Sequence, residues 1–260
     1  MRILLIADET PFFHPNYVRN LLTLLKNKEH KLFGAVVTKI QNKNNMESYF
    51  KRNFLKLHFF ELFLLGSIKI FSLLFALIFP WGYKKNNFSV KSAFRSLKIP
   101  CLKIKNDINL KEYIEKIKGL NLDLIISSTS LYFGKEILEL PKLGCINRHC
   151  ALLPSYKGFW PIFQAIAHGE KEIGVTIHKM TTKIDSGIIL TQQKSSIGHT
   201  KNLYKIYKML FPLTPKIVTE AIDNLIKDKS IKTYSYKESY FTFPTNDNWH
   251  NFRKNGGKII

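Results

Sequence analysis

The sequence GCINRHCALLPSYKG, residues 144–158, contains the pattern that decides the fold. Asn147 and His149 are separated by one residue, and Pro154 follows shortly after. On a strand, alternate side chains point to the same face, so Asn147 and His149 would face one pocket and Arg148 the opposite side. Proline cannot donate to a ladder, so the strand should end before it. The stretch therefore predicts a strand with an amide and an imidazole on one face, close to its end.

Short apolar runs alternate with helical patterns on both sides of this stretch. We expect strands at residues 2–7, 30–38, 97–105, 122–127, 144–149, 174–180 and 187–193, and helices at 17–25, 110–117, 162–167 and 203–226. Strands that are apolar on both faces and alternate with helices are typical of a parallel sheet covered by helices. The predicted fold is α/β, a Rossmann-like, doubly wound and mainly parallel sheet with helices on both faces. Ligands bind such sheets at the carboxyl edge of the strands.

A length of 260 residues suits one substantial core with an appendage. We expect a catalytic domain at residues 1–200 and a short C-terminal extension, a helix and tail, at residues 201–260. An apolar helical insert at about residues 50–85 interrupts the first of these. No internal repeat is apparent.

The insert is the most apolar part of the chain. Residues 54–81 read FLKLHFFELFLLGSIKIFSLLFALIFPW and are flanked by lysines and an arginine. A membrane-spanning helix here would place strands of one sheet on opposite sides of the bilayer, which argues against a span. A helix pair that turns at Gly66-Ser67 and lies in the membrane interface is one interpretation. Packing of these helices on the sheet or on a second subunit, in a homodimer, is the other, and periodicity does not separate the two.

The composition excludes few functions. The net charge of +21 is compatible with a nucleic-acid or membrane partner, but the lysines are scattered through every segment, so we do not expect a nucleic-acid partner from charge alone. The spacing of the three cysteines indicates neither a zinc site nor a disulfide framework. The N-terminus MRILLIADE lacks the layout of a signal peptide. We expect a cytoplasmic protein, with the inner face of the membrane as a second location if the insert binds lipid.

Asp185, in the motif KIDSG, lies 36 residues after His149 at a turn between two expected strands. Alone, it could simply form the turn, and a single histidine is more often structural than catalytic. Together, the carboxylate could orient the imidazole. The chain has no GxSxG motif, and Cys150 is expected on the face opposite His149. A trio of Asn147, His149 and Asp185 without a nucleophile indicates that the attacking group comes from a substrate.

The same region resembles the core of the formyltransferases that use 10-formyltetrahydrofolate. The shared motifs are N-x-H, LLP-x-x-x-G, G-x-T-x-x-x-M and D-x-G, in this order and at the family's spacings, within about forty-five residues. The resemblance extends more weakly over residues 1–197, apart from the insert.

The resemblance implies roles for particular residues. His149 would accept the proton of an attacking amine, Asp185 would hold and polarise the imidazole, and Asn147 would donate to the developing oxyanion. The cosubstrate would be 10-formyltetrahydrofolate, and no metal is expected. By similarity, the pterin pocket lies in the loop beside the catalytic strand, at Leu131, Tyr132, Phe133, Gly134 and Ile137. Ordinary packing under a loop is the alternative for the aromatic residues among them.

The acceptor follows from differences within the family. Glycinamide ribonucleotide formyltransferases have a glycine- and serine-rich phosphate loop after the first strand, where this chain has DETPFFHP. Methionyl-tRNA formyltransferases append a sizeable C-terminal domain, whereas about sixty residues follow the core here. The PFFHP loop resembles that of the sugar N-formyltransferases. We therefore expect the amino group of a nucleotide- or lipid-linked deoxy-aminosugar in surface-polysaccharide biosynthesis, with aminoacyl-tRNA as the alternative. A non-catalytic binding module and a basic membrane-attachment protein are hypotheses from other classes.

Overall fold

The computed structural model describes residues 1–38, 54–84, 86–198, 201–229, 231 and 236–260. In chain order its elements are β1 (Arg2–Asp8), α1 (His14–Asn27), β2 (Lys31–Thr38), the short 3-10 helix η1 (Phe54–Lys56), α3 (Phe59–Ile78), α4 (Val90–Ser96), β3 (Cys101–Lys105), α5 (Lys111–Lys118), β4 (Leu124–Ser128), α6 (Lys135–Glu139), β5 (Cys145–His149), β6 (Lys157–Gly158), α7 (Pro161–Ala167), β7 (Glu172–Lys179), β8 (Ile189–Ser196), α8 (Leu203–Ile226), β9 (Tyr240–Phe241) and α9 (Asn246–Lys254).

One sheet contains the strands β3, β2, β1, β4, β5, β7 and β8, in this spatial order. The strands from β3 to β5 are mutually parallel, and β7 and β8 each run antiparallel to the preceding neighbour. All of β4 is buried, as is the interior of β1, because helices cover both faces of the parallel region. The predicted mainly parallel sheet is confirmed.

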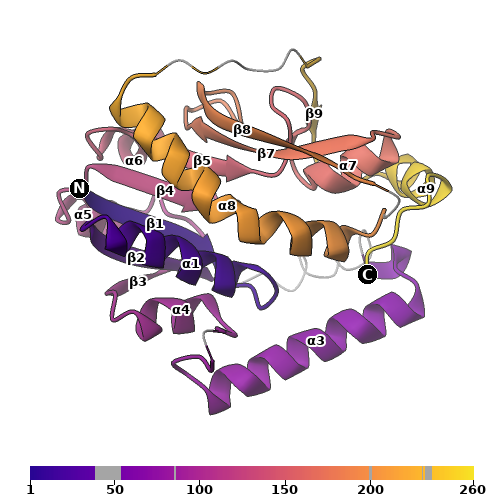
Figure 1. Ribbon diagram of the computed structural model, residues 1–260, viewed down its shortest axis with the longest axis horizontal. Helices are drawn as coiled ribbons and strands as arrows, with labels where there is room; N and C mark the ends of the chain where they lie inside the picture. The colour runs from indigo at the N-terminus through magenta and orange to yellow at the C-terminus, as the bar shows by residue number, and fades with distance from the viewer. Residues whose placement is uncertain (39–53, 85, 199–200, 230, 232–235) are drawn as a thin grey trace.

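Two apolar layers enclose the sheet, one on each face. Helices α1 and α8 lie side by side on one face (Figure 1), and their buried side chains belong to one core cluster. Helices α5 and α6 contribute to a second cluster on the other face. The predicted doubly wound arrangement is therefore confirmed. The division at residue 200 stays a prediction.

Strand β5 occupies the junction between the parallel and antiparallel parts of the sheet. It pairs with β4 in parallel and with β7 in antiparallel register, so that Asn147 is opposite His178. The carboxyl ends of β1, β4 and β5 therefore meet at one edge, and β7 begins its return beside them. This edge positions the site described below.

The insert forms one helix, so the predicted helix pair with a turn at Gly66-Ser67 is wrong. Helix α3 runs without interruption from Phe59 to Ile78. The main-chain N–H of His58 donates to the Glu61 carboxylate at 3.0 Å at its start, and Pro80 follows its end. Within it, Gly66 has open space around its α-carbon and the Ser67 hydroxyl donates to a carbonyl of the preceding turn. The surrounding leucine and phenylalanine residues continue the helix through this weak point, since a single glycine costs only about 1 kcal/mol.

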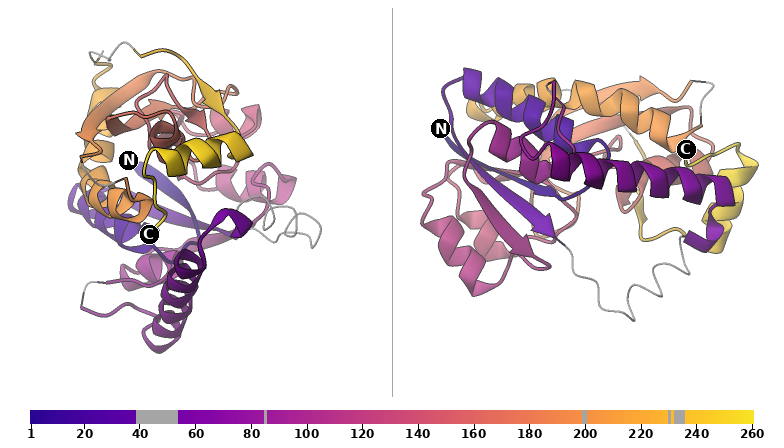
Figure 2. Two further views of the ribbon diagram at one scale, coloured as in Figure 1. Left: turned by 90° about the vertical axis from the view of Figure 1, so that its right-hand side faces the viewer. Right: turned by 90° about the horizontal axis from the view of Figure 1, so that it is seen from below.

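Helix α3 lies along the outside of the domain (Figure 2), with most of its side chains exposed. By length and composition it could cross a membrane, and it is the one such helix in the described part of the chain.

The tail after α8 forms two elements that the sequence analysis did not predict. Strand β9 pairs with β6 in the loop that follows the β5 strand, and α9 packs on α7. The contact between α9 and α7 includes the stacked rings of Phe163 and Phe252, whose centroids are 4.2 Å apart, and the edge-on contact of Phe163 with Trp249. The tail thus holds the loop that follows the catalytic strand.

Candidate active site

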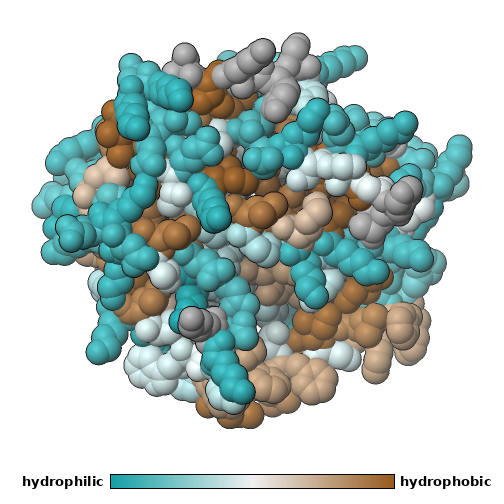
Figure 3. Space-filling model, viewed as in Figure 1, coloured by the Kyte–Doolittle hydropathy of each residue, from teal (hydrophilic) through white to brown (hydrophobic). Residues whose placement is uncertain are grey.

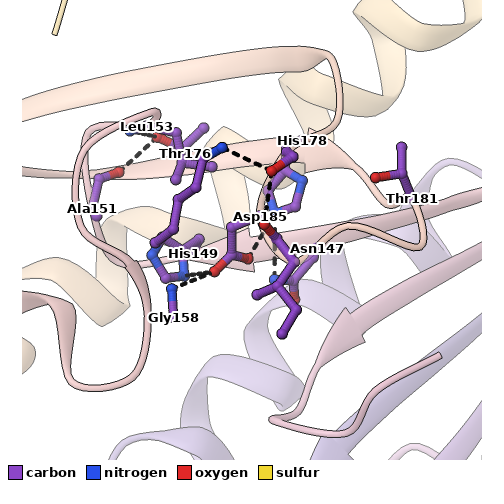
Figure 4. A network of polar contacts seen from close by, with 12 residues as sticks. Asn147, His149, Ala151, Leu153, Gly158, Thr176, His178, Thr181 and Asp185 are labelled. Carbon is purple, nitrogen blue, oxygen red and sulfur yellow. Dashed lines mark hydrogen bonds and ion pairs between the residues drawn. The ribbon is translucent and has the colours of Figure 1, made fainter. Parts of the chain in front are cut away.

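The three predicted catalytic residues lie together at the carboxyl edge of the sheet. Asn147 and His149 are on β5, and Asp185 is in the connection between β7 and β8 (Figure 4). Asp185 has a positive φ of 49°, a conformation that aspartate tolerates better than most residues. This turn brings its carboxylate back over the end of β5.

The Asp185 carboxylate contacts two imidazoles and one main-chain amide. Its Oδ2 is 3.4 Å from Nδ1 of His149 and accepts a hydrogen bond from the N–H of Gly158 at 2.9 Å. Its Oδ1 is 3.4 Å from Nε2 of His178. Burial raises the pKa of Asp185, but these contacts outweigh it and lower the pKa to about 2. The carboxylate is therefore ionised at neutral pH.

The two ring nitrogens of His149 have different partners. Nε2 lies 2.8 Å from the carbonyl oxygen of Tyr156, which can only accept, so the neutral ring carries its proton on Nε2. Nδ1 then presents its lone pair beside the Asp185 carboxylate. Burial lowers the pKa of His149 below its usual value, and the charge of Asp185 opposes this shift only in part. The ring is thus arranged to take up a proton at Nδ1, where the resulting cation meets a carboxylate.

His178 is a site residue that the sequence analysis missed. Its Nε2 lies between the Asp185 carboxylate and the side-chain amide of Asn147, whose Nδ2 is 3.5 Å away. The sequence contained a signal for this residue in the motif GVTIHKM. There Thr176 and His178 are two residues apart on an expected strand and therefore share one face. Pairing β7 with β5 required the tertiary structure, since register between distant strands is not set by local sequence.

Asn147 retains unused hydrogen-bonding capacity. Its Oδ1 is buried and has no partner among the described residues, and its amide nitrogen makes only the long contact to His178. Buried polar atoms normally have partners, so an orphan at the centre of a cavity indicates a place for a ligand's polar group.

These residues line a cavity of about 720 Å³. On the side of α5 and α6 its wall includes Leu131, Tyr132 and Phe133, as predicted for the cosubstrate pocket. The structure does not bring Gly134 and Ile137 to this wall. Gly134 begins α6, and Ile137 is fully buried in the core behind Phe133. The apolar slot fits a flat pterin, and the amide nitrogen of Asn147 has a second N–H that can donate to a formyl oxygen.

The chain matches the formyl transferase family over residues 87–222, which contain β4, β5, β7 and the Asp185 turn. It is 38% identical over 128 residues to a methionyl-tRNA formyltransferase of Thermotoga neapolitana, covering 49% of this chain and 41% of that protein. It is 38% identical over 145 residues to the bifunctional polymyxin resistance protein ArnA of Wigglesworthia glossinidia brevipalpis, covering 54% of this chain and 22% of that protein.

Among solved structures, the sugar 3N-formyltransferase WlaRD, determined in the presence of dTDP and 5-N-formyl-THF, is similar with a TM-score of 0.59. That likeness covers 100% of this chain and 82% of WlaRD at 16% identity, and shows the fold alone. The chain spans less than half of the length of the two curated relatives. Because the family match extends over half of the chain and includes the complete Asn147, His149 and Asp185 trio, the chain belongs to the formyl transferase family.

Proposed function

We propose that this protein transfers a formyl group from 10-formyltetrahydrofolate to a primary amine. The observation that carries this proposal is the His149–Asp185 pair beside Asn147 in one cavity. The cosubstrate supplies the formyl carbon. The amine nitrogen forms a bond to that carbon as the bond from the carbon to the folate nitrogen breaks.

His149 handles the proton that the amine loses. Nδ1 is its free acceptor, and it receives the proton directly or through a water molecule. Asp185 stabilises the imidazolium, which then returns the proton to the departing folate nitrogen. The low pKa of His149 keeps the ring neutral, and therefore basic, before the reaction begins.

Asn147 supports the formyl oxygen. Its Nδ2 has a second N–H that is not directed at His178, and this donor would bind the oxygen as negative charge develops on it. Leu131, Tyr132 and Phe133, which line the cavity, would hold the pterin.

The acceptor that we propose is the amino group of a nucleotide- or lipid-linked deoxy-aminosugar used for surface polysaccharide. A cavity of about 720 Å³ suits a small molecule, and the fold relationship to a sugar 3N-formyltransferase supports this class. Aminoacyl-tRNA is the second candidate, because a methionyl-tRNA formyltransferase is among the relatives.

The test is a formyl-transfer assay with 10-formyltetrahydrofolate and two sets of acceptors. One set contains nucleotide-linked amino sugars, and the other contains methionyl-tRNA with uncharged tRNA as its blank. Release of tetrahydrofolate with an amino sugar supports the proposal, and release with methionyl-tRNA alone replaces it by the second candidate. Absence of transfer to every amine would overturn it.

We also propose that α3 rests on an anionic membrane surface. The exposed apolar side chains form one broad face of α3, with Phe59 84% and Leu77 78% exposed, whereas Glu61, Leu65 and Ile68 on the opposite face are buried or half-buried. A single broad apolar face suits the surface of a bilayer. Brown and tan surface gathers along the lower part of Figure 3, where Figure 1 places α3. Lysines and the +21 net charge would add attraction to anionic lipid.

Both ends of α3 are tied to the domain. At its start, Glu61 accepts hydrogen bonds from the Arg253 guanidinium and from the N–H of Ile259. At its end, the rings of Phe75 and Phe79 pack on Phe88. The helix can therefore lie on a bilayer without crossing it. Leu65 of α3 also lines the catalytic cavity, so a membrane-bound α3 would place the cavity close to the lipid surface.

A further inference from the structure

Arg148 packs against two aromatic rings on the face of β5 opposite the catalytic trio. Its guanidinium carbon is 5.1 Å from the ring centroid of Tyr17 on α1 and 4.5 Å from that of Phe211 on α8. The alternation of side chains along a strand predicted that Arg148 would point away from the face of Asn147 and His149. Both rings are within range of a cation–π contact with the guanidinium, whose N–H groups remain to find acceptors.

The acceptors at that edge are neutral and incomplete. Nε donates to the Ser128 hydroxyl at 3.3 Å, Nη1 to the sulfur of Cys150 at 3.1 Å, and Nη2 contacts Nε2 of His14 at 3.5 Å. A guanidinium has five N–H groups, so two have no acceptor within the part of the chain that the structure describes. In that part, Arg148 also forms no ion pair with a carboxylate.

The surroundings do not neutralise this charge. Burial, and then the charge of Arg148 itself, lower the pKa of His14 to about 3, so this neighbour is neutral. The first turn of α1, which starts at His14, contains no acidic residue, and its N-cap residue Phe13 makes no side-chain cap. A desolvated guanidinium without a counterion is costly, and proteins retain such groups when a ligand supplies the charge.

The catalytic cavity reaches this guanidinium. Its wall on the side of α1 and α8 includes Phe13, His14, Arg148, Tyr207 and Phe211. The wall on the other side is the loop at residues 131–133 proposed for the pterin, and Asn147 and His149 line the same cavity. With the formyl donor beside residues 131–133, the side of the cavity that contains Arg148 is left for the acceptor.

We propose that Arg148 is an anion-binding residue that holds a phosphate group of the acceptor, with the two free N–H groups as a forked donor pair. The assignment of the anion to the acceptor rests on the proposed function, whereas anion binding itself does not. The substrate class is then a phosphorylated or diphosphate-linked amino sugar. A free amino sugar lacks the phosphate that Arg148 would bind.

The test titrates the full-length protein, without folate, with pyrophosphate, inorganic phosphate and acetate by calorimetry. Pyrophosphate should bind at one site, and Arg148→Met should raise its Kd at least tenfold, with a smaller rise in Arg148→Lys because an ammonium does not reproduce the fork. Lys208→Met, which removes an exposed charge on α8 outside the cavity, should bind as the wild type does. Preferential binding of acetate would replace the phosphate by a carboxylate.

Folding is checked separately by circular dichroism and melting temperature. We expect Arg148→Met to melt at or above the wild-type temperature, because methionine can pack against the same rings without an unpaired charge. Pyrophosphate binding that is unchanged in a folded Arg148→Met protein would overturn the proposal. If that variant does not fold, unchanged binding by Arg148→Lys has the same meaning.

A second experiment, on steady-state kinetics, tests whether this anion site serves the formyl-transfer reaction. Arg148→Met should raise KM at least tenfold for a nucleoside-diphosphate-linked amino sugar and leave KM for the corresponding free amino sugar unchanged. Equal effects on both acceptors would overturn the assignment to the acceptor's phosphate. If no acceptor is formylated, the proposed function fails, and calorimetry still decides whether Arg148 binds an anion.

Discussion

Nδ1 of His149 and Oδ2 of Asp185 are 3.4 Å apart, and the other nitrogen of the same ring faces the carbonyl oxygen of Tyr156. A carbonyl oxygen cannot donate, so the neutral ring keeps its proton on the side away from the carboxylate. This arrangement leaves one position for a new proton and a counterion beside it.

Replacement of His149 by Asn should lower kcat for formyl transfer by about 10²–10⁴-fold, because the proton acceptor is lost. Asp185→Ala should also abolish most activity, since the imidazolium would lose its counterion. Steady-state kinetics measure both effects, and an unchanged melting temperature excludes unfolding as the cause. Near-normal turnover in either variant would show that the proton leaves by another route.

Asn147→Ala should lower kcat by about 10²–10³-fold with little change in KM, because its hydrogen bond strengthens as the formyl oxygen becomes anionic. Kinetics with both substrates varied separate the two parameters. An unchanged kcat with a raised KM would instead make Asn147 a residue that binds the ground state.

The pH profile of kcat/KM should have an acidic limb with a midpoint below 6.5, because burial lowers the pKa of His149 from that value. Activity is present above this pKa, where the ring is neutral, and is lost as pH falls through it. In Asp185→Asn the residual activity should show a midpoint at still lower pH, because the carboxylate charge raises the pKa of His149. A midpoint that moves upward in this variant contradicts the assignment.

His178 should act by positioning Asn147 and Asp185. His178→Leu should lower kcat by up to about 100-fold, as expected when a reacting group is misplaced, and His178→Gln should lower it less because it keeps a polar contact. The acidic midpoint should move upward in both variants, since His178 contributes to the lowered pKa of His149. A purely structural role would reduce the melting temperature and leave this midpoint in place.

The protein should float with anionic vesicles at low salt and less completely at high salt, because apolar burial and lysine charges act together. The double change Phe71→Ser and Leu77→Ser, at two exposed positions of α3, should weaken flotation. The matched control is Ile188→Ser with Ile226→Ser, which removes two exposed apolar side chains elsewhere and should have no effect.

Protein that stays at the bottom of the gradient under both salt conditions would exclude the membrane surface. Analytical sedimentation of the same variants then tests the alternative. A wild-type dimer that dissociates when α3 is changed identifies this helix as a subunit interface.

Most of the fold could be predicted from the sequence, because its signals are local. Apolar runs alternate with helical periodicity, and the predicted helix at residues 203–226 coincides with α8. The side-chain alternation on residues 145–149 also predicted that Asn147 and His149 share one face. The prediction of a helix pair in the insert was wrong for a physical reason. The Gly66-Ser67 pair weakens a helix by an amount that its neighbours offset, so composition alone did not decide between one helix and two.

The sequence by itself therefore predicted the sheet, the helices at residues 17–25, 110–117, 162–167 and 203–226, and the candidate trio Asn147, His149 and Asp185, since each follows from residue type and spacing along the chain. Only the tertiary structure decided how those residues meet. The Asp185 turn had to fold back over β5 before a carboxylate could lie beside Nδ1 of His149, and β7 had to pair with β5 before His178 could join them. Only the tertiary structure likewise showed that the partners of Arg148 among the described residues are neutral groups, because they come from three separate segments of the chain.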